Sequence, residues 1–253
     1  MVMNGQITVV ILGACFLAWR ALERKRHFLA GCALGLLAIK PQFGLPFAVI
    51  VLVRRDWRML GGALASVATQ ASIVWLALGS QAFLGYYSML PSIVAHADAL
   101  EPKAFQSHSI RSLTRLLPAW AGVPAWLLVA GLVLWKTARA WCEQAPIAVR
   151  FGLAMLASVL VNPHLIVYDA GILVLPLIWF ATWYVQRKEA VAVQTFGALV
   201  YALFLAFLVP TAALIYVQLS VPVMLWLFWS VADRAIRADT SSTRLDLAAH
   251  SFA

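Results

Sequence analysis

The sequence predicts an all-α protein that crosses a membrane many times, and three observations support this prediction. First, 63% of the 253 residues are hydrophobic and 11% are charged, against about 45–50% and about 25% in soluble domains. Second, the apolar residues form long runs that short basic segments separate. Third, the 11 Trp and 13 Phe residues suit lipid-facing helices and the aromatic belts of membrane interfaces.

Nine apolar runs mark the candidate helices. A membrane-spanning helix needs about 20 apolar residues, so the chain has room for about eight or nine hydrophobic segments and for no separate soluble domain. The runs are 7–22, 28–39, 43–53, 59–78, 120–135, 147–161, 165–185, 190–209 and 211–231.

The second and third runs are shorter than the roughly 17 residues that a span requires. Lys40, Pro41 and Gln42 separate them, and Pro46 is expected to interrupt the third run further. Broken helices at membrane depth are tolerated where they face protein or a water-filled cavity. Two interpretations stay open: a short broken pair across 28–53 with Lys40 in a cavity, or two tilted spans with Lys40 reaching the interface.

The basic residues indicate the orientation of the spans. If every run crosses the membrane, 15 of the 19 Lys and Arg residues fall on one side, and Lys40, Lys103, Arg111 and Arg115 fall on the other. By the positive-inside rule, the first side is cytoplasmic. We therefore expect a multi-pass protein of the cell (inner) membrane, with its N-terminus outside and its C-terminus in the cytoplasm. The net charge of +9 then sets topology and does not indicate nucleic-acid binding.

This topology divides the chain into a transmembrane helical domain, 1–232, and a polar cytoplasmic tail, 233–253. The transmembrane domain carries one long outer loop, 80–119, in which 83–94 is weakly amphipathic and is expected to lie along the membrane interface. A polytopic chain usually starts inside, so a first span that enters from outside predicts an upstream portion that this sequence lacks.

Small residues and cysteines are expected to serve packing. The pairs Gly31/Gly35 and Gly61/Ala65 have the spacing of close helix–helix contacts in membranes. The three cysteines show no metal-ligand spacing, and no phosphate loop or catalytic signature of a soluble hydrolase is present. We therefore expect no metal ion and no cofactor.

The polar residues of the outer side are the candidates for chemistry, because ionisable groups at membrane depth are costly and usually functional. Asp169 stands near the start of an apolar run, so its carboxylate needs a partner, either Lys40 or an Arg of the outer loop. His164 can titrate near neutral pH. Lys40 together with Arg111 or Arg115 would suit the phosphate or pyrophosphate of an anionic headgroup.

Several short motifs, spread over most of residues 5–185, have counterparts in one known family. They are Gly5-Gln6 at the start of a span, Gly31 through Gly35, Lys40-Pro41-Gln42, Arg54-Arg55-x-Trp57-Arg58, the polar stretch 106–113, and Asn162-Pro163-His164 followed by Tyr168-Asp169. In this set the chain resembles glycosyltransferase family 87, which includes polyprenol-phosphate-mannose-dependent mannosyltransferases.

The resemblance implies a GT-C helical bundle whose active site faces away from the cytoplasm. It implies inverting transfer of a sugar, mannose in those members, from a polyprenyl-phosphate donor to a lipid or glycan acceptor. Catalytic roles fall on His164 and Asp169. The residues expected to bind the donor or substrate are Lys40, Gln42, Gln6, His108 and Arg111. The family's key aspartate lies in an outer loop before the Gly-Gln span, and this sequence has no such loop before Gly5.

Two other readings remain open at the level of sequence. The chain would also suit a non-catalytic membrane protein, either transporter-like or a lipid-binding scaffold, because transporters use broken helices too. An inactive truncated remnant of a glycosyltransferase would show the same motifs.

Overall fold

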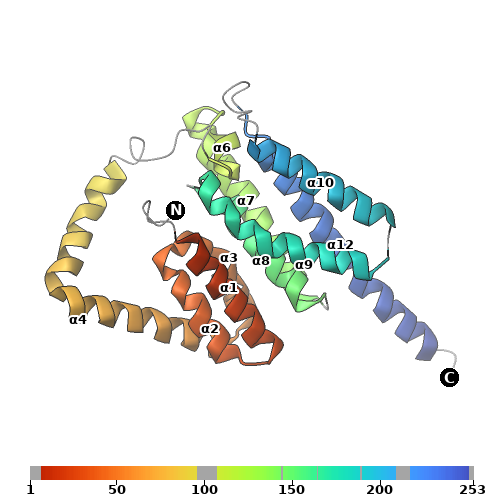
Figure 1. Cartoon of the computed structure of the whole chain (residues 1–253), viewed down its shortest axis with the longest axis horizontal. Helices are drawn as coiled ribbons and strands as arrows, with labels where there is room; N and C mark the ends of the chain where they lie inside the picture. The colour runs from red at the N-terminus through yellow and green to blue at the C-terminus, as the bar shows by residue number, and fades with distance from the viewer. Residues whose placement is uncertain are drawn as a thin grey trace.

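The computed structural model describes residues 7–95, 107–143, 145–163, 165–188, 190–208 and 217–250 (Figure 1). Within these residues every regular element is a helix, and one isolated bridge joins Ser107 to Ile166. In the same part of the chain, four helices are long and apolar enough to cross a membrane, with shorter apolar helices beside them. The prediction of an all-α, multi-pass membrane bundle is confirmed.

The first half of the chain forms a helical group from which one long helix departs (Figure 1). Helix α4 bends at Gly79, whose φ of 71° is outside the helical region, so the predicted interfacial stretch 83–94 continues α4 as a second helical arm. The elements are α1 (Thr8–Glu23), α2 (His27–Gly35), the 3₁₀ turns η2 (Leu36–Ile39) and η3 (Pro41–Phe43), α3 (Leu45–Arg54) and α4 (Trp57–Ala95).

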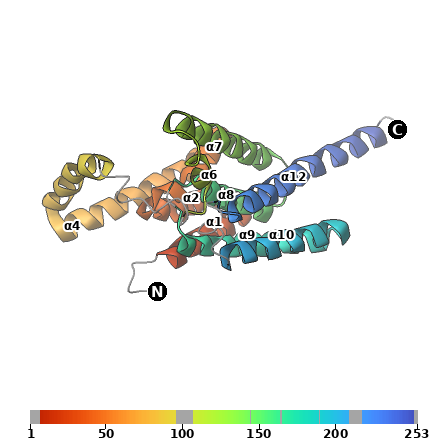
Figure 2. The ribbon, with the colours of Figure 1, turned by 90° about the horizontal axis from the view of Figure 1, so that it is seen from above.

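The second half surrounds the buried helix α8, which lies between α7 on one side and α9 and α10 on the other (Figure 2). Helix α8 contacts α1, α3, α7, α9 and α12. From Phe151 to Val161 it is apolar on all sides except at Ser158, which is the pattern of a helix enclosed by protein, and every residue of this stretch is buried. The remaining elements are α6 (Ile110–Thr114), α7 (Ala119–Cys142), α8 (Ile147–Val161), η5 (Val167–Leu173), α9 (Val174–Gln186), α10 (Ala190–Leu208) and α12 (Ser220–His250).

The predicted break between 28–39 and 43–53 is present and lies at Lys40. The residue before a proline is pushed out of the α region, and Lys40 has φ −134° and ψ 80° in front of Pro41. The prediction that Pro46 interrupts the following helix is wrong. Pro46 lies in the first turn of α3, where its missing N–H would have no helical acceptor in any case.

Glycines bring α2 and α4 into backbone contact. A Cβ on Gly31 would lie 1.9 Å from the Met59 carbonyl oxygen, and one on Gly62 would lie 2.0 Å from the Phe28 carbonyl oxygen. The expected packing role of Gly31 and Gly35 is therefore confirmed. Gly61 faces open space, so its neighbour Gly62 provides the contact from α4.

Substitution of Gly62 by alanine is expected to destabilise the protein by about 1–3 kcal/mol, since a methyl group there forces two backbones apart. Gly61→Ala is the matched control one residue away, where nothing lies within 4 Å and alanine favours the helix. Thermal unfolding of both variants in detergent, followed by far-UV circular dichroism, checks the difference. Equal melting temperatures would contradict the α2–α4 contact.

Candidate functional site

The centre of the candidate site is an ion pair between Lys40 and Asp169. The Lys40 Nζ donates to Asp169 Oδ1 over 2.7 Å, and the two residues are 129 positions apart. The Asp169 side chain is 4% exposed and that of Lys40 is 27% exposed. The carboxylate thus has the partner that its burial requires, and the ammonium stays accessible from one side. Of the two partners expected for Asp169, the structure selects Lys40.

Each member of the pair stands where a regular α-helix is interrupted. Lys40 lies between η2 and η3, and Asp169 lies in the 3₁₀ segment η5 that precedes α9. An interrupted helix exposes polar groups at membrane depth, and it is tolerated there because neighbouring protein groups can form hydrogen bonds with them. The pair therefore joins the break in the first half of the chain to the helix start in the second half.

Two residues that sequence reasoning missed complete the site. Thr8, in the first turn of α1, places Oγ1 3.5 Å from Asp169 Oδ1 and 3.4 Å from the Tyr168 carbonyl oxygen. The Lys40 Nζ also lies 5.9 Å from the centroid of the Phe43 ring, within cation–π range. The position of Thr8 two residues after the Gly5-Gln6 motif was the signal that could have drawn attention to it.

The neighbours of the pair differ in exposure. The side chain of Tyr168 is 52% exposed while Asp169 is buried, so these two consecutive residues point to different surroundings. Gln42 lies in η3, two residues after Lys40, and is half-buried. Gln6 and His164 lie outside the described residues, so their predicted roles stay predictions.

His108 lies in a buried polar contact between the start of α6 and the later helices. Its backbone N–H donates to the Leu165 carbonyl oxygen over 2.9 Å, which fastens this segment to the chain just before η5. Its Nδ1 is 2.8 Å from Ser220 Oγ, its Nε2 is 3.4 Å from Gln218 Nε2, and its ring packs against Phe207. Both ring nitrogens thus face protein groups, and a donor-binding role for His108 stays a prediction.

Acidification is expected to weaken the fold through His108. His108 precedes α6 and lies outside the helices that are long enough to cross a membrane, and burial lowers the pKa of its imidazole from 6.5 to about 4. The folded state therefore binds this proton less readily than the unfolded state, so stability is retained above pH 6.5 and falls as pH decreases toward 4. Melting temperatures measured from pH 7.5 to 4.5 should fall less steeply in His108→Gln than in the wild type. Parallel curves would contradict the assignment.

Arg111 is held on α6 by an aromatic contact. Its guanidinium carbon lies 5.7 Å from the centroid of the Trp126 ring on α7, and the residue is half-buried. A cation–π contact of this kind orients a guanidinium without neutralising its charge. Among the predicted site residues that the structure describes, only Lys40 and Asp169 form a side-chain contact with each other.

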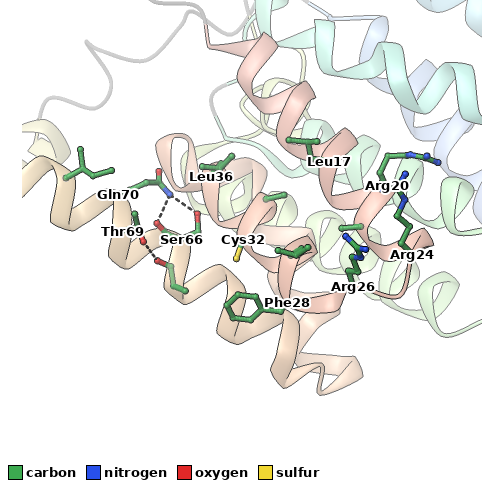
Figure 3. Close-up of a pocket in the computed structure, with 15 residues that line it drawn as sticks. Leu17, Arg20, Arg24, Arg26, Phe28, Cys32, Leu36, Ser66, Thr69 and Gln70 are labelled. Carbon is green, nitrogen blue, oxygen red and sulfur yellow. Dashed lines mark hydrogen bonds between the residues drawn. The ribbon is translucent and has the colours of Figure 1, made fainter.

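A separate cavity of about 690 Å³ lies between α1, α2 and α4 (Figure 3). Arg20, Arg24 and Arg26 lie together at one end of it, while Gln70 lies at the other and donates to the Gly35 carbonyl oxygen over 2.9 Å. The walls between them are largely apolar. Because neither Lys40 nor Asp169 lines this cavity, it is distinct from the candidate site.

A multi-pass helical membrane protein with a partly buried Lys–Asp pair at a helix break is thus the class that the fold and site define. Glycosyltransferase family 87 matches the chain over residues 1–163, which include Lys40 and end before Asp169. The chain therefore belongs to glycosyltransferase family 87. This membership implies a membrane glycosyltransferase with a sugar donor and an acceptor in a membrane. No curated protein and no solved structure matches the chain.

Proposed function

We propose that the protein transfers a sugar, mannose, from a polyprenyl-phosphate donor to a lipid or glycan acceptor on the non-cytoplasmic side of the cell membrane. The observation that carries this proposal is the Lys40–Asp169 pair in a chain of glycosyltransferase family 87. A partly exposed cation held at the break of a membrane helix suits the phosphate of a lipid-linked sugar.

In the proposed reaction an acceptor hydroxyl attacks the anomeric carbon of the donor sugar. The bond between that carbon and the phosphate oxygen breaks, and the polyprenyl phosphate leaves with the electron pair. Lys40 has three N–H donors, of which Asp169 takes one, so two can bind the leaving phosphate as its charge develops. Asp169 fixes the direction of the ammonium, and His164 assists in removing the proton of the hydroxyl.

An apolar cavity beside the pair supports a lipid donor. It has a volume of about 390 Å³ and is lined by Pro41, the neighbour of Lys40 in the chain, by Gly44, and by Leu37, Leu45 and Leu52, but not by Lys40 or Asp169 themselves. An isoprenoid chain would find hydrocarbon walls there within reach of the cation that takes its phosphate. A nucleotide sugar, which is polar along its length, would gain nothing from such a wall.

The proposal also fixes an orientation. A GT-C arrangement with residues 1–232 in the membrane places the Lys40–Asp169 end outside, and it places the tail 233–253 in the cytoplasm. The site is then on the face where a lipid-linked donor, and no nucleotide sugar, is available.

The test is a transfer assay with the intact protein, expressed from its own locus, in isolated membranes. Radiolabelled mannose should pass from polyprenyl phosphate to a membrane acceptor, and membranes that lack the protein should not support this transfer. Labelled nucleotide sugar, supplied with lipid-donor synthesis blocked, should give no product. Transfer directly from the nucleotide sugar would overturn the donor assignment, and solute flux in proteoliposomes without any transfer would favour the transporter-like alternative.

A further inference from the structure

A second charged cavity lies at the end of the bundle opposite the Lys40–Asp169 pair. Thr8, at the first residue of α1, contacts Asp169, whereas Glu23, the last residue of α1, lines this cavity. The two places are thus separated by the length of α1, about 24 Å at 1.5 Å per residue. The cavity has a volume of about 780 Å³ and is lined by the cations Lys25, Arg54, Arg55, Arg58 and Arg150.

The carboxylates that line the cavity are already engaged elsewhere. Glu23 Oε2 accepts from Arg20 over 2.7 Å. Asp56 pairs with His27, and its Oδ1 accepts from the Met59 N–H over 3.1 Å. In the part of the chain that the structure describes, no carboxylate lies within ion-pair distance of Lys25, Arg54, Arg55 or Arg58. The cavity therefore holds an excess of positive charge.

Arg150 shows that the excess of positive charge in the cavity extends below the protein surface. Its Nη1 donates to the Trp141 carbonyl oxygen over 3.0 Å, while its buried Nε has no hydrogen-bond partner among the described residues. The positive charge of Arg54 also repels the positive charge of Arg150. A buried donor without an acceptor and two repelling guanidinium groups are both unfavourable. An anion between the two guanidinium groups would relieve their repulsion.

Two of the cations that line the cavity also have an unusual backbone conformation. Lys25 and Arg55, which follow α1 and α3, have φ of 57° and 53°, in the left-handed region where glycine ends a helix without strain. The positive-inside rule requires only that cations are present in these loops, and it does not require them at particular positions.

Aromatic residues place the cavity at the depth of lipid headgroups. Trp57, which is 65% exposed, lines it, together with Trp141, which is buried in the protein. Tryptophan concentrates at the boundary between hydrocarbon and water in membrane proteins. We therefore expect a phosphate bound at this depth to be part of a phospholipid headgroup and not an ion dissolved in water.

We propose that this basic cavity binds the phosphate of an anionic phospholipid in the membrane leaflet next to Arg54 and Arg55. This cavity is separate from the proposed sugar-transfer site. An experiment can therefore disprove lipid binding here without disproving sugar transfer, and the reverse. By the predicted orientation, the leaflet is the cytoplasmic one, where anionic headgroups attract clustered Lys and Arg.

The test uses the full chain in detergent, titrated with dioctanoyl phosphatidylglycerol and followed by native mass spectrometry. Phosphatidylglycerol should bind at least about tenfold more tightly than phosphatidylcholine with the same chains, given several cations that each contribute about fivefold. Lys25→Gly and Arg55→Gly should each weaken binding about fivefold. Because glycine accepts the left-handed backbone, both variants should melt at or above the wild-type temperature.

Lys188→Gly is the matched control. Lys188 has the same left-handed backbone, with φ 55°, but does not line the cavity, so its substitution should leave lipid binding unchanged. Equal affinity for phosphatidylcholine, or an equal loss of binding in Lys188→Gly, would overturn the proposal. Inorganic phosphate that binds as tightly as phosphatidylglycerol would overturn the choice of a lipid and indicate a free anion.

Discussion

Lys40→Met and Asp169→Asn are each expected to reduce sugar transfer by about 10²–10³-fold, the usual cost of removing one preorganised group that stabilises developing charge. The first substitution removes the ammonium that would bind the leaving phosphate. The second keeps the shape of the side chain but removes the charge that holds the ammonium in place. The measurement is kcat/KM for transfer from a polyprenyl-phosphate sugar, with the intact protein in membranes.

A second Lys–Asp pair supplies the control. Lys136, on α7, pairs with Asp233, on α12, and Asp233 lines a separate cavity with Arg234 and Arg237. Lys136→Met therefore removes a comparable ion pair between two helices without touching the candidate site, and transfer should stay near the wild-type level. If Lys40→Met retained full activity, or if Lys136→Met lost as much, the proposed role of Lys40 would be wrong.

Much of the fold could be predicted from the sequence because membrane constraints act locally. Lys40-Pro41 predicts a helix break, since proline restricts the residue before it, and the break is present. Asp169 needs a partner because a buried carboxylate without one is too costly, which narrowed the choice to Lys40 or an outer-loop Arg. The rule identifies the need for a partner, and only the tertiary packing that brings η5 next to Lys40 decides which candidate meets that need.

The rest of the site depends on contacts that no local pattern encodes. Thr8 reaches Asp169 across 161 positions, and a threonine at the start of an apolar run looks the same whether it faces lipid or protein. His108 is enclosed by Ser220, Gln218 and Phe207, from segments about 100 residues away. Gly62, and not Gly61, faces α2 because the rotation of α4 is set by its neighbours. In each case the residue type was visible and the direction of its side chain was not.

The stability of the same variants separates a structural role of the pair from a catalytic one. Lys40→Met leaves the 4% exposed carboxylate of Asp169 without its counterion and should cost about 3–5 kcal/mol. Asp169→Asn should cost less, because the Lys40 ammonium is 27% exposed and can turn toward water. The double variant Lys40→Met/Asp169→Asn has no uncompensated charge and should be more stable than Lys40→Met alone, with a favourable coupling in the double-mutant cycle.

These unfolding free energies can be measured by denaturant titration in mixed micelles, alongside the transfer assay. The double variant should recover stability and still lack transfer, because packing can replace a buried ion pair but no methionine can bind a leaving phosphate. Recovery of both stability and transfer would show that the pair only supports the fold. Strictly additive losses would show that Lys40 and Asp169 do not depend on each other, against the 2.7 Å contact between them.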